Sequence, residues 1–248
     1  AMTSQPSLRE GNLPVEDRLE RGHAYGEIDL EQTSASPEDW PTYRCDPGRS
    51  GKTSTRVTPD FTEIWRTSLG GKLTSPVVAG GRVYVASTDE HSLLTLDAAT
   101  GEILRRYYFN ARIDSPPTVY QGIVFCGCRD GSVHAIRAED STLIWKFNAA
   151  PVERLIVSQG QLESTWPVHG SVLVVNDTIY FAAGRSSYLD GGLRLYGLDP
   201  RTGRMLIDAP VNSRNVNGSE TLDEQGVVGC LNDILSSNGE RIFMRHQA

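Results

Sequence analysis

Hydrophobic and polar positions alternate along the middle of the chain in short runs that return at a regular interval. Residues 75–87 read "SPVVAGGRVYVAS", and residues 115–127, 40 positions later, read "SPPTVYQGIVFCG". A third copy, "SVLVVNDTIYFAA", begins at Ser171. Each copy holds two apolar runs separated by Gly, Asn or Asp, which predicts a β-hairpin with a tight turn.

A second pair of runs follows each hairpin, around the turns "LDAATGEIL", "IRAEDSTLIW" and "LDPRTGRML". Four short strands in a repeat of about 40 residues are typical of a β-propeller blade. We therefore predict an all-β fold with complete blades at about 72–110, 111–150 and 169–212, and an insertion at 149–168.

The flanking segments match parts of the same repeat. "FTEIWRTSLGG" (61–71) reads as an outermost strand, which ends a lead-in at 39–71, and the segment 228–246 reads as an inner hairpin without its outer strands. Together they predict a split fourth blade. Residues 1–38 are polar and read as an extension or linker, with a short helix possible in "PVEDRLER".

The turn pattern Asp-x-x-Thr-Gly after a β-hairpin resembles the repeat of quinoprotein-like (PQQ-like) β-propellers, over roughly residues 39–246. The lead-in "DWPTYRCDPGRSG" is similar to that of large bacterial proteins with this repeat, although Cys45 stands where the usual form has His. The resemblance implies the fold. Because dehydrogenases, assembly scaffolds and sensors share this repeat, it does not choose among those functions.

Members of that family usually carry seven or eight blades, so the resemblance implies a truncated half-propeller. We expect two copies to close an eight-bladed ring as a C2 homodimer, since open sheet edges and apolar faces favour pairing. The alternative is a compact monomer covered by residues 1–38.

Composition narrows the partners. The formal net charge is −7, which gives no basic surface for nucleic acid. No apolar run approaches the roughly 18 residues of a membrane span. The start, "AMTSQPSLRE", has no apolar region of a signal peptide, so we expect a soluble, bacterial-type protein of unknown compartment.

Histidines and carboxylates next to the inner strands are candidate metal ligands. His169 and Asp233 precede inner strands, Asp114 stands at the same blade position as Asp233, and His246 ends the last hairpin. They could hold a divalent ion such as zinc or calcium. Equally, His169 could bond a neighbouring blade, the aspartates could cap backbone amides, and His246 could lie in a frayed end.

The two long insertions lie on the face of the D–A and B–C loops, where a propeller presents binding sites. The loops of this face supply Arg185 as a candidate catalytic residue and the following candidate ligand-binding residues: Asp114, Arg129, Arg154, Glu163, Trp166 and Asp190. Arginine would serve as a bidentate donor to an anion or sugar. The structural alternatives are surface salt bridges for the charges and a plug between blades for Trp166. Trp65 and Trp145 resemble the docking tryptophans of quinoprotein repeats, a structural role.

We expect a binding or scaffold module that holds a small molecule, a sugar or a peptide segment on this loop face and in the central channel. The alternative is a metal-dependent hydrolase with catalytic residues His169, Asp233 and Arg185, using a metal-activated water. No cofactor is certain. PQQ is unexpected, because quinoprotein dehydrogenases hold it with two adjacent cysteines and this chain has no adjacent pair.

Overall fold

A computed structural model describes residues 14–27, 36–56, 59–187, 190–211 and 229–247, with the backbone alone for 229–233 and 246–247. The described chain is almost entirely β-structure. Its one helix is a short 3-10 turn, η1 (Val15–Arg18), and no described helix is long and apolar enough to cross a membrane.

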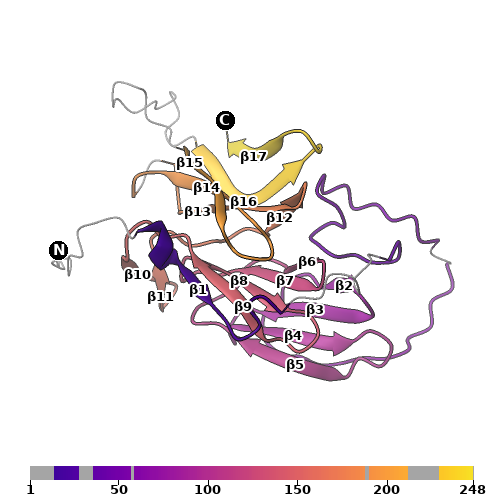
Figure 1. The fold of residues 1–248 in the computed structure, drawn as a ribbon. Coiled ribbons are helices and arrows are strands. Elements are labelled where there is room, and N and C mark those ends of the chain that lie inside the picture. Colours follow the sequence, from indigo (N-terminus) through magenta and orange to yellow (C-terminus); the bar gives the residue numbers. More distant parts are fainter. Residues whose placement is uncertain (1–13, 28–35, 57–58, 188–189, 212–228, 248) are drawn as a thin grey trace.

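Three antiparallel sheets of four consecutive strands form the predicted blades, stacked face to face in Figure 1. The first holds β2 (Val77–Ala79), β3 (Arg82–Ser87), β4 (Ser92–Asp97) and β5 (Ile103–Tyr108). The second holds β6 (Thr118–Tyr120), β7 (Ile123–Gly127), β8 (Ser132–Arg137) and β9 (Leu143–Asn148). The third holds β12 (Leu173–Val175), β13 (Thr178–Ala183), β14 (Leu193–Leu198) and β15 (Met205–Val211).

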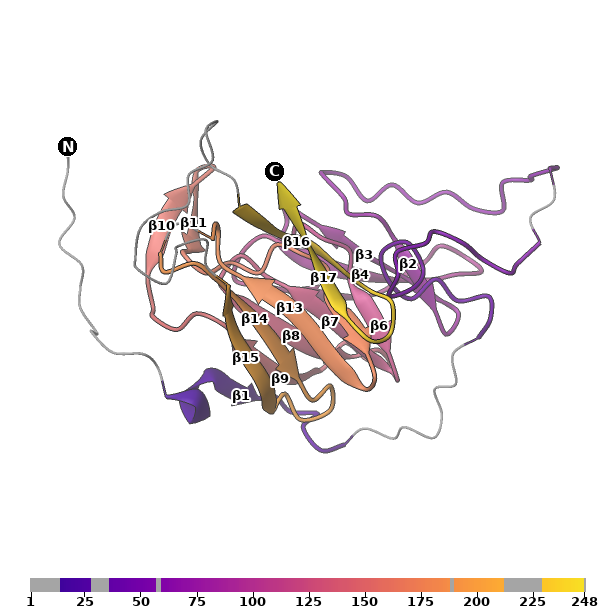
Figure 2. The same ribbon diagram turned by 90° about the horizontal axis from the view of Figure 1, so that it is seen from above.

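The last hairpin, β16 (Gly229–Ser237) and β17 (Ile242–Gln247), forms the predicted half-blade. An isolated parallel bridge between Ser171 and Ile234 joins it to the start of the third blade. Figure 2 shows this hairpin, in yellow, lying along the third sheet. The fold is therefore a partial propeller, as the sequence predicts, while the homodimer stays a prediction.

The core lies between the blades. Ile123 and Phe125 of β7 belong to a buried cluster shared with the third blade, whereas Val124 and Cys126 belong to one shared with the first blade. Successive residues of a strand point to opposite faces, so both faces of the second blade are buried. That is why β7 reads as a continuous apolar run.

Two segments differ from the prediction. Residues 61–71 form no strand, because the described chain supplies no neighbouring strand for them, yet Trp65 still docks on the first blade. Within the expected extension 1–38, β1 (Leu19–Arg21) pairs antiparallel with β9 and adds a fifth strand to the second blade. The helix expected there is reduced to η1.

The lead-in runs along the inner edges of the blades, beside β2 and β6 in Figure 1. Main-chain hydrogen bonds of 2.7 to 2.9 Å join residues 40–47 to Val78, Val119 and Ser237. Arg49, which is 8% exposed, then donates from Nε to the carbonyl of Leu235 at 3.0 Å. The lead-in thus contacts the first blade, the second blade and the half-blade.

Candidate functional site

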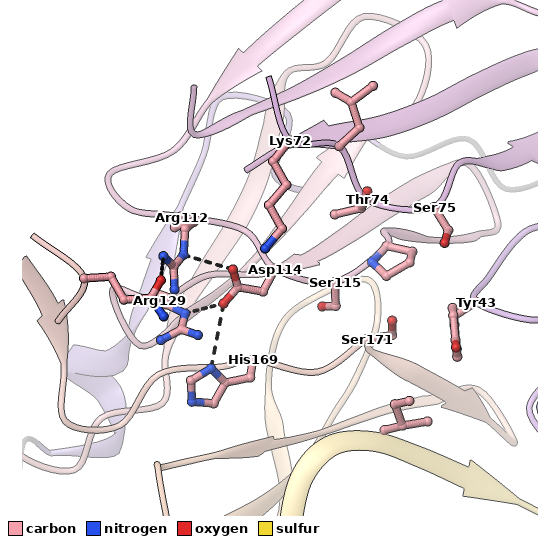
Figure 3. Close-up of a pocket in the computed structure, with 14 residues that line it drawn as sticks. Tyr43, Lys72, Thr74, Ser75, Arg112, Asp114, Ser115, Arg129, His169 and Ser171 are labelled. Atoms are coloured by element: carbon pink, nitrogen blue, oxygen red, sulfur yellow. Dashed lines mark hydrogen bonds and ion pairs between the residues drawn. The ribbon is translucent and has the colours of Figure 1, made fainter. Parts of the chain in front are cut away.

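A cavity of about 650 Å³ opens where the inner strands begin. Its lining takes one residue from the same repeat position of each of the three blades and of the half-blade: Ser75, Ser115, Ser171 and Ile234. Figure 3 shows the three serines along the middle and right of the cavity, with Tyr43 of the lead-in at its far right. Three hydroxyl-bearing positions and one apolar position therefore surround a common space.

Two cations occupy a second repeated position, three residues before the serines of the first two blades. Lys72 precedes Ser75 and Arg112 precedes Ser115, and both cations line the cavity. Lys72 is exposed, and its ammonium group has no ion-pair partner among the described residues, although its main-chain N–H donates to Asp89 at 3.3 Å.

Arg112 belongs to an ion-pair network of two arginines and two carboxylates. Its Nε lies 2.9 Å from Asp114 Oδ1, and its Nη2 lies 3.4 Å from Glu163 Oε1. Arg129 donates from Nε to Asp114 Oδ2 and from Nη1 to Glu163 Oε2, the latter at 2.7 Å. The Glu163 side chain is 2% exposed. The two positive charges of the arginines and the two negative charges of the carboxylates cancel. The ammonium of Lys72 therefore adds one net positive charge to this side of the cavity.

The environment of Asp114 determines its ionisation. Burial opposes the charged form, but interactions with His169 and Arg129 and the charge of Arg112 outweigh it and hold the pKa of Asp114 well below its usual range. Asp114 is therefore a carboxylate at neutral pH. Both its oxygens face guanidinium groups, so it is poorly suited to act as a general base.

His169 lies at the edge of the same network. Its Nδ1 stands 3.9 Å from Asp114 Oδ2, too far for a direct hydrogen bond. Its side chain is 19% exposed and lines the cavity. Figure 3 shows the ring below the two arginines, on their side of the cavity. The imidazole can therefore contact a molecule bound there.

The insertion after the second blade supplies part of this wall. It forms a hairpin of β10 (Leu155–Ser158) and β11 (Gln161–Ser164), where a continuous insertion without assigned structure had been expected. Glu163 belongs to β11, and Gln159 in the turn accepts a hydrogen bond from Arg112 Nη1. Gln161 contacts His91 Nε2 at 3.1 Å, which ties the hairpin to the first blade.

The other predicted ligand residues gather elsewhere, in a separate pocket of about 280 Å³. Arg154, Trp166 and Asp190 line it. Arg185 donates to Asp190 Oδ2, while Arg154 Nη1 stands 3.4 Å from Asp190 Oδ1. Sequence reasoning treated one face as one site, and the structure divides its residues between two pockets.

Of the three predicted metal ligands His169, Asp233 and His246, the structure describes the side chain of His169 alone. Asp233 directly precedes Ile234 in β16, but the side chains of Asp233 and His246 lie outside the described ones. Among described residues, no three His, Cys, Asp or Glu side chains are grouped as metal ligands. Asp114 and Glu163 face arginines, whose positive charge opposes a cation, so the described residues do not fit a metal.

Sequence reasoning did not single out the three serines of the cavity, and among its other polar residues it missed Tyr43, Lys72, Thr74, Arg112 and Gln159. A signal existed for two of them, since Lys72 and Arg112 share one position in the aligned repeats. Tyr43 and Gln159 lie in segments outside the repeat, where alignment gives no information about distance from the axis.

Comparisons with known proteins agree with this architecture. A family model described as outer membrane protein assembly factor BamB matches residues 55–243. A europium-containing methanol dehydrogenase matches with a TM-score of 0.57 and 20% identity, over 79% of this chain and 35% of that one. The quinohemoprotein alcohol dehydrogenase of Comamonas testosteroni matches with a TM-score of 0.56 and 18% identity, over 73% of this chain and 28% of that one.

These identities support a shared fold alone, and this chain spans about a third of the length of both dehydrogenases. A search of curated proteins finds no match.

Proposed function

Because the chain belongs to the family of the outer membrane protein assembly factor BamB, we propose that it is a propeller binding module rather than a redox enzyme. Its ligand is a small hydroxylated organic anion, held in the cavity at the start of the inner strands. The observation that carries this proposal is Lys72, whose positive charge faces the cavity beside a charge-neutral network.

The remaining lining suits the same ligand. Although the net charge of the chain is −7, cationic side chains line this cavity. The hydroxyl groups of Ser75, Ser115 and Ser171 can donate or accept hydrogen bonds. Arg112 and Arg129 are already oriented by carboxylates, so little side-chain entropy is lost when they contact an anion. A carboxylate near Lys72 with hydroxyl groups along the serines would use all of these groups.

No specific observation favours the metal-dependent hydrolase. It needs a divalent ion near His169, and the carboxylates described there are engaged by arginines. It remains a prediction that depends on the side chains of Asp233 and His246.

The test compares a charged and a neutral probe of the same shape. We expect glucuronate to bind measurably by titration calorimetry and glucose to bind much more weakly. Lys72→Gln should weaken glucuronate binding roughly tenfold. This corresponds to the lower end of the free energy that a hydrogen bond to a charged group contributes. Lys52→Gln removes another exposed lysine outside the cavity and should leave binding unchanged.

Equal affinity of the two sugars, or equal effects of the two lysine substitutions, would contradict an anion site at Lys72. Loss of binding on adding EDTA would instead support the metal-dependent alternative.

A further inference from the structure

The second pocket is built by the two segments that interrupt the repeat. Pro151, Val152, Arg154, Thr165 and Trp166 come from the insertion after the second blade, and Asp190, Gly191 and Arg194 come from the enlarged loop of the third blade and the start of β14. Segments that depart from a repeat are not needed to complete its sheets, and loops on a rigid scaffold commonly carry binding sites. Their meeting in one pocket therefore calls for a functional explanation.

Positive charge exceeds negative charge around this pocket. Asp190 is held by Arg185, and Arg194 is held by Asp208, with Nε and Nη2 donating at 2.8 and 2.7 Å. Among the described residues, the guanidinium of Arg154 makes a single polar contact, with Asp190 at 3.4 Å, and its side chain is 66% exposed. Its guanidinium is therefore available to a further anionic partner.

The rest of the lining consists of an apolar wall and one hydroxyl group without a hydrogen-bond partner among the described residues. Pro151, Val152 and the indole of Trp166 form an apolar wall. Thr165 is 1% exposed, and its hydroxyl has no hydrogen-bond partner among the described residues. An unsatisfied buried hydroxyl costs about 1 to 3 kcal/mol, so a bound group that reached the Thr165 hydroxyl would gain a hydrogen bond there.

Gly191 keeps the pocket open beside the indole. Its φ is +89°, and a Cβ placed on it would lie 3.8 Å from Trp166 Cζ2. A side chain at residue 191 would therefore be strained and would narrow the space next to the ring.

We propose that this pocket is a second binding site, independent of the cavity at Lys72, for a small organic acid with an apolar body. The carboxylate binds Arg154 and reaches the Thr165 hydroxyl, and the apolar body packs against Val152 and Trp166. Asp190 orients Arg154 without neutralising it, because its other oxygen is held by Arg185.

The experiment uses benzoate, with benzamide as the uncharged control of matched shape. The four tryptophans give four indole N–H signals in a ¹H–¹⁵N spectrum, and Trp166→Phe identifies the one from Trp166. We expect benzoate to shift this signal in a saturable manner at millimolar concentration, whereas benzamide leaves it in place. Arg154→Gln should weaken benzoate binding at least fivefold, and Lys72→Gln should not weaken it.

Thr165→Val separates a binding role from a structural one. Valine has nearly the same shape and lacks the hydroxyl, so a hydroxyl that serves a ligand predicts weaker benzoate binding together with an unchanged or higher Tm. A lower Tm with unchanged binding would overturn the role of Thr165 and support a buried water there. No shift of the Trp166 signal up to 20 mM benzoate, or an Arg154→Gln protein that binds as well as the unmodified chain, would overturn the site.

Discussion

At the scale of single residues, burial decides which titratable groups remain neutral. His134 is 3% exposed in β8, where Tyr107 of the first blade bonds Nδ1 and Ser132 contacts Nε2, both at 3.0 Å. Burial lowers its pKa to about 4, although the charge of Asp130 opposes the shift and Lys146 assists it. His134 therefore packs between the first and second blades.

This shift predicts a pH dependence of stability. Between about pH 6.5 and 4 the unfolded chain binds a proton at His134 that the folded chain does not, so the free energy of unfolding falls as the pH falls through this window. The full effect is about 3 kcal/mol. Urea unfolding between pH 6.5 and 5, above the titration of most carboxyls, measures the slope.

His134→Gln removes the titrating group and should flatten this slope. An unchanged slope in that variant would show that another group is responsible.

At the scale of elements, two tryptophans each dock on the turn between the two outer strands of the following blade. Trp65 Nε1 donates to the carbonyl of Ala98, and Trp145 Nε1 donates to that of Pro200, each at 3.0 Å. The receiving turns carry Gly101 and Gly203, both with positive φ and both against the indole. The structural role expected for the two tryptophans is confirmed.

Gly203→Ala should destabilise the chain by about 2 to 4 kcal/mol, because it combines backbone strain with overpacking. Its φ is +67°, and a Cβ there would lie 2.7 Å from Trp145. Gly80→Ala is the matched control, with φ +57° and open space around the Cβ position, so it should cost only about 1 kcal/mol. Chemical denaturation measures the free energy of unfolding of both variants, and the difference between them gives the steric cost at residue 203. Equal losses of stability would show that the indole does not pack closely on the turn.

The repeat explains which parts of the molecule could be predicted. Strands of the three blades follow from alternation and from turns such as that of Asp97, whose carboxylate accepts from the N–H groups of Ala99 and Thr100. The grouping of Arg112 with Glu163 could not be predicted, because it depends on how an insertion folds back. Nor could the pairing of β1 with β9, since a three-residue polar strand has no distinctive pattern.

At the scale of the whole molecule, Arg49 connects distant sheets. Its guanidinium donates to Thr42 Oγ1 at 2.7 Å and to the carbonyl of Leu235 at 3.0 Å, and its Nη2 lies 3.5 Å from the carbonyl of Val172. Burial lowers its pKa to about 10, so the group stays charged at neutral pH with neutral acceptors.

Arg49→Met keeps much of the volume and removes these donors, leaving buried carbonyl groups unsatisfied. We expect a loss of about 2 to 4 kcal/mol and faster hydrogen exchange at the amides of β12 and β16. Exchange that accelerates equally in β4 would contradict a local role of Arg49 in holding the last hairpin.

The contact between Arg49 and Leu235 also has a consequence in time. The two residues are 186 positions apart. During synthesis at 5 to 20 residues per second, the acceptor follows the donor by roughly 10 to 40 s. The first blades can fold in that interval, but the cavity that Ser171 and Ile234 complete cannot exist. A nascent chain therefore has folded sheets before it has any capacity to bind at that cavity.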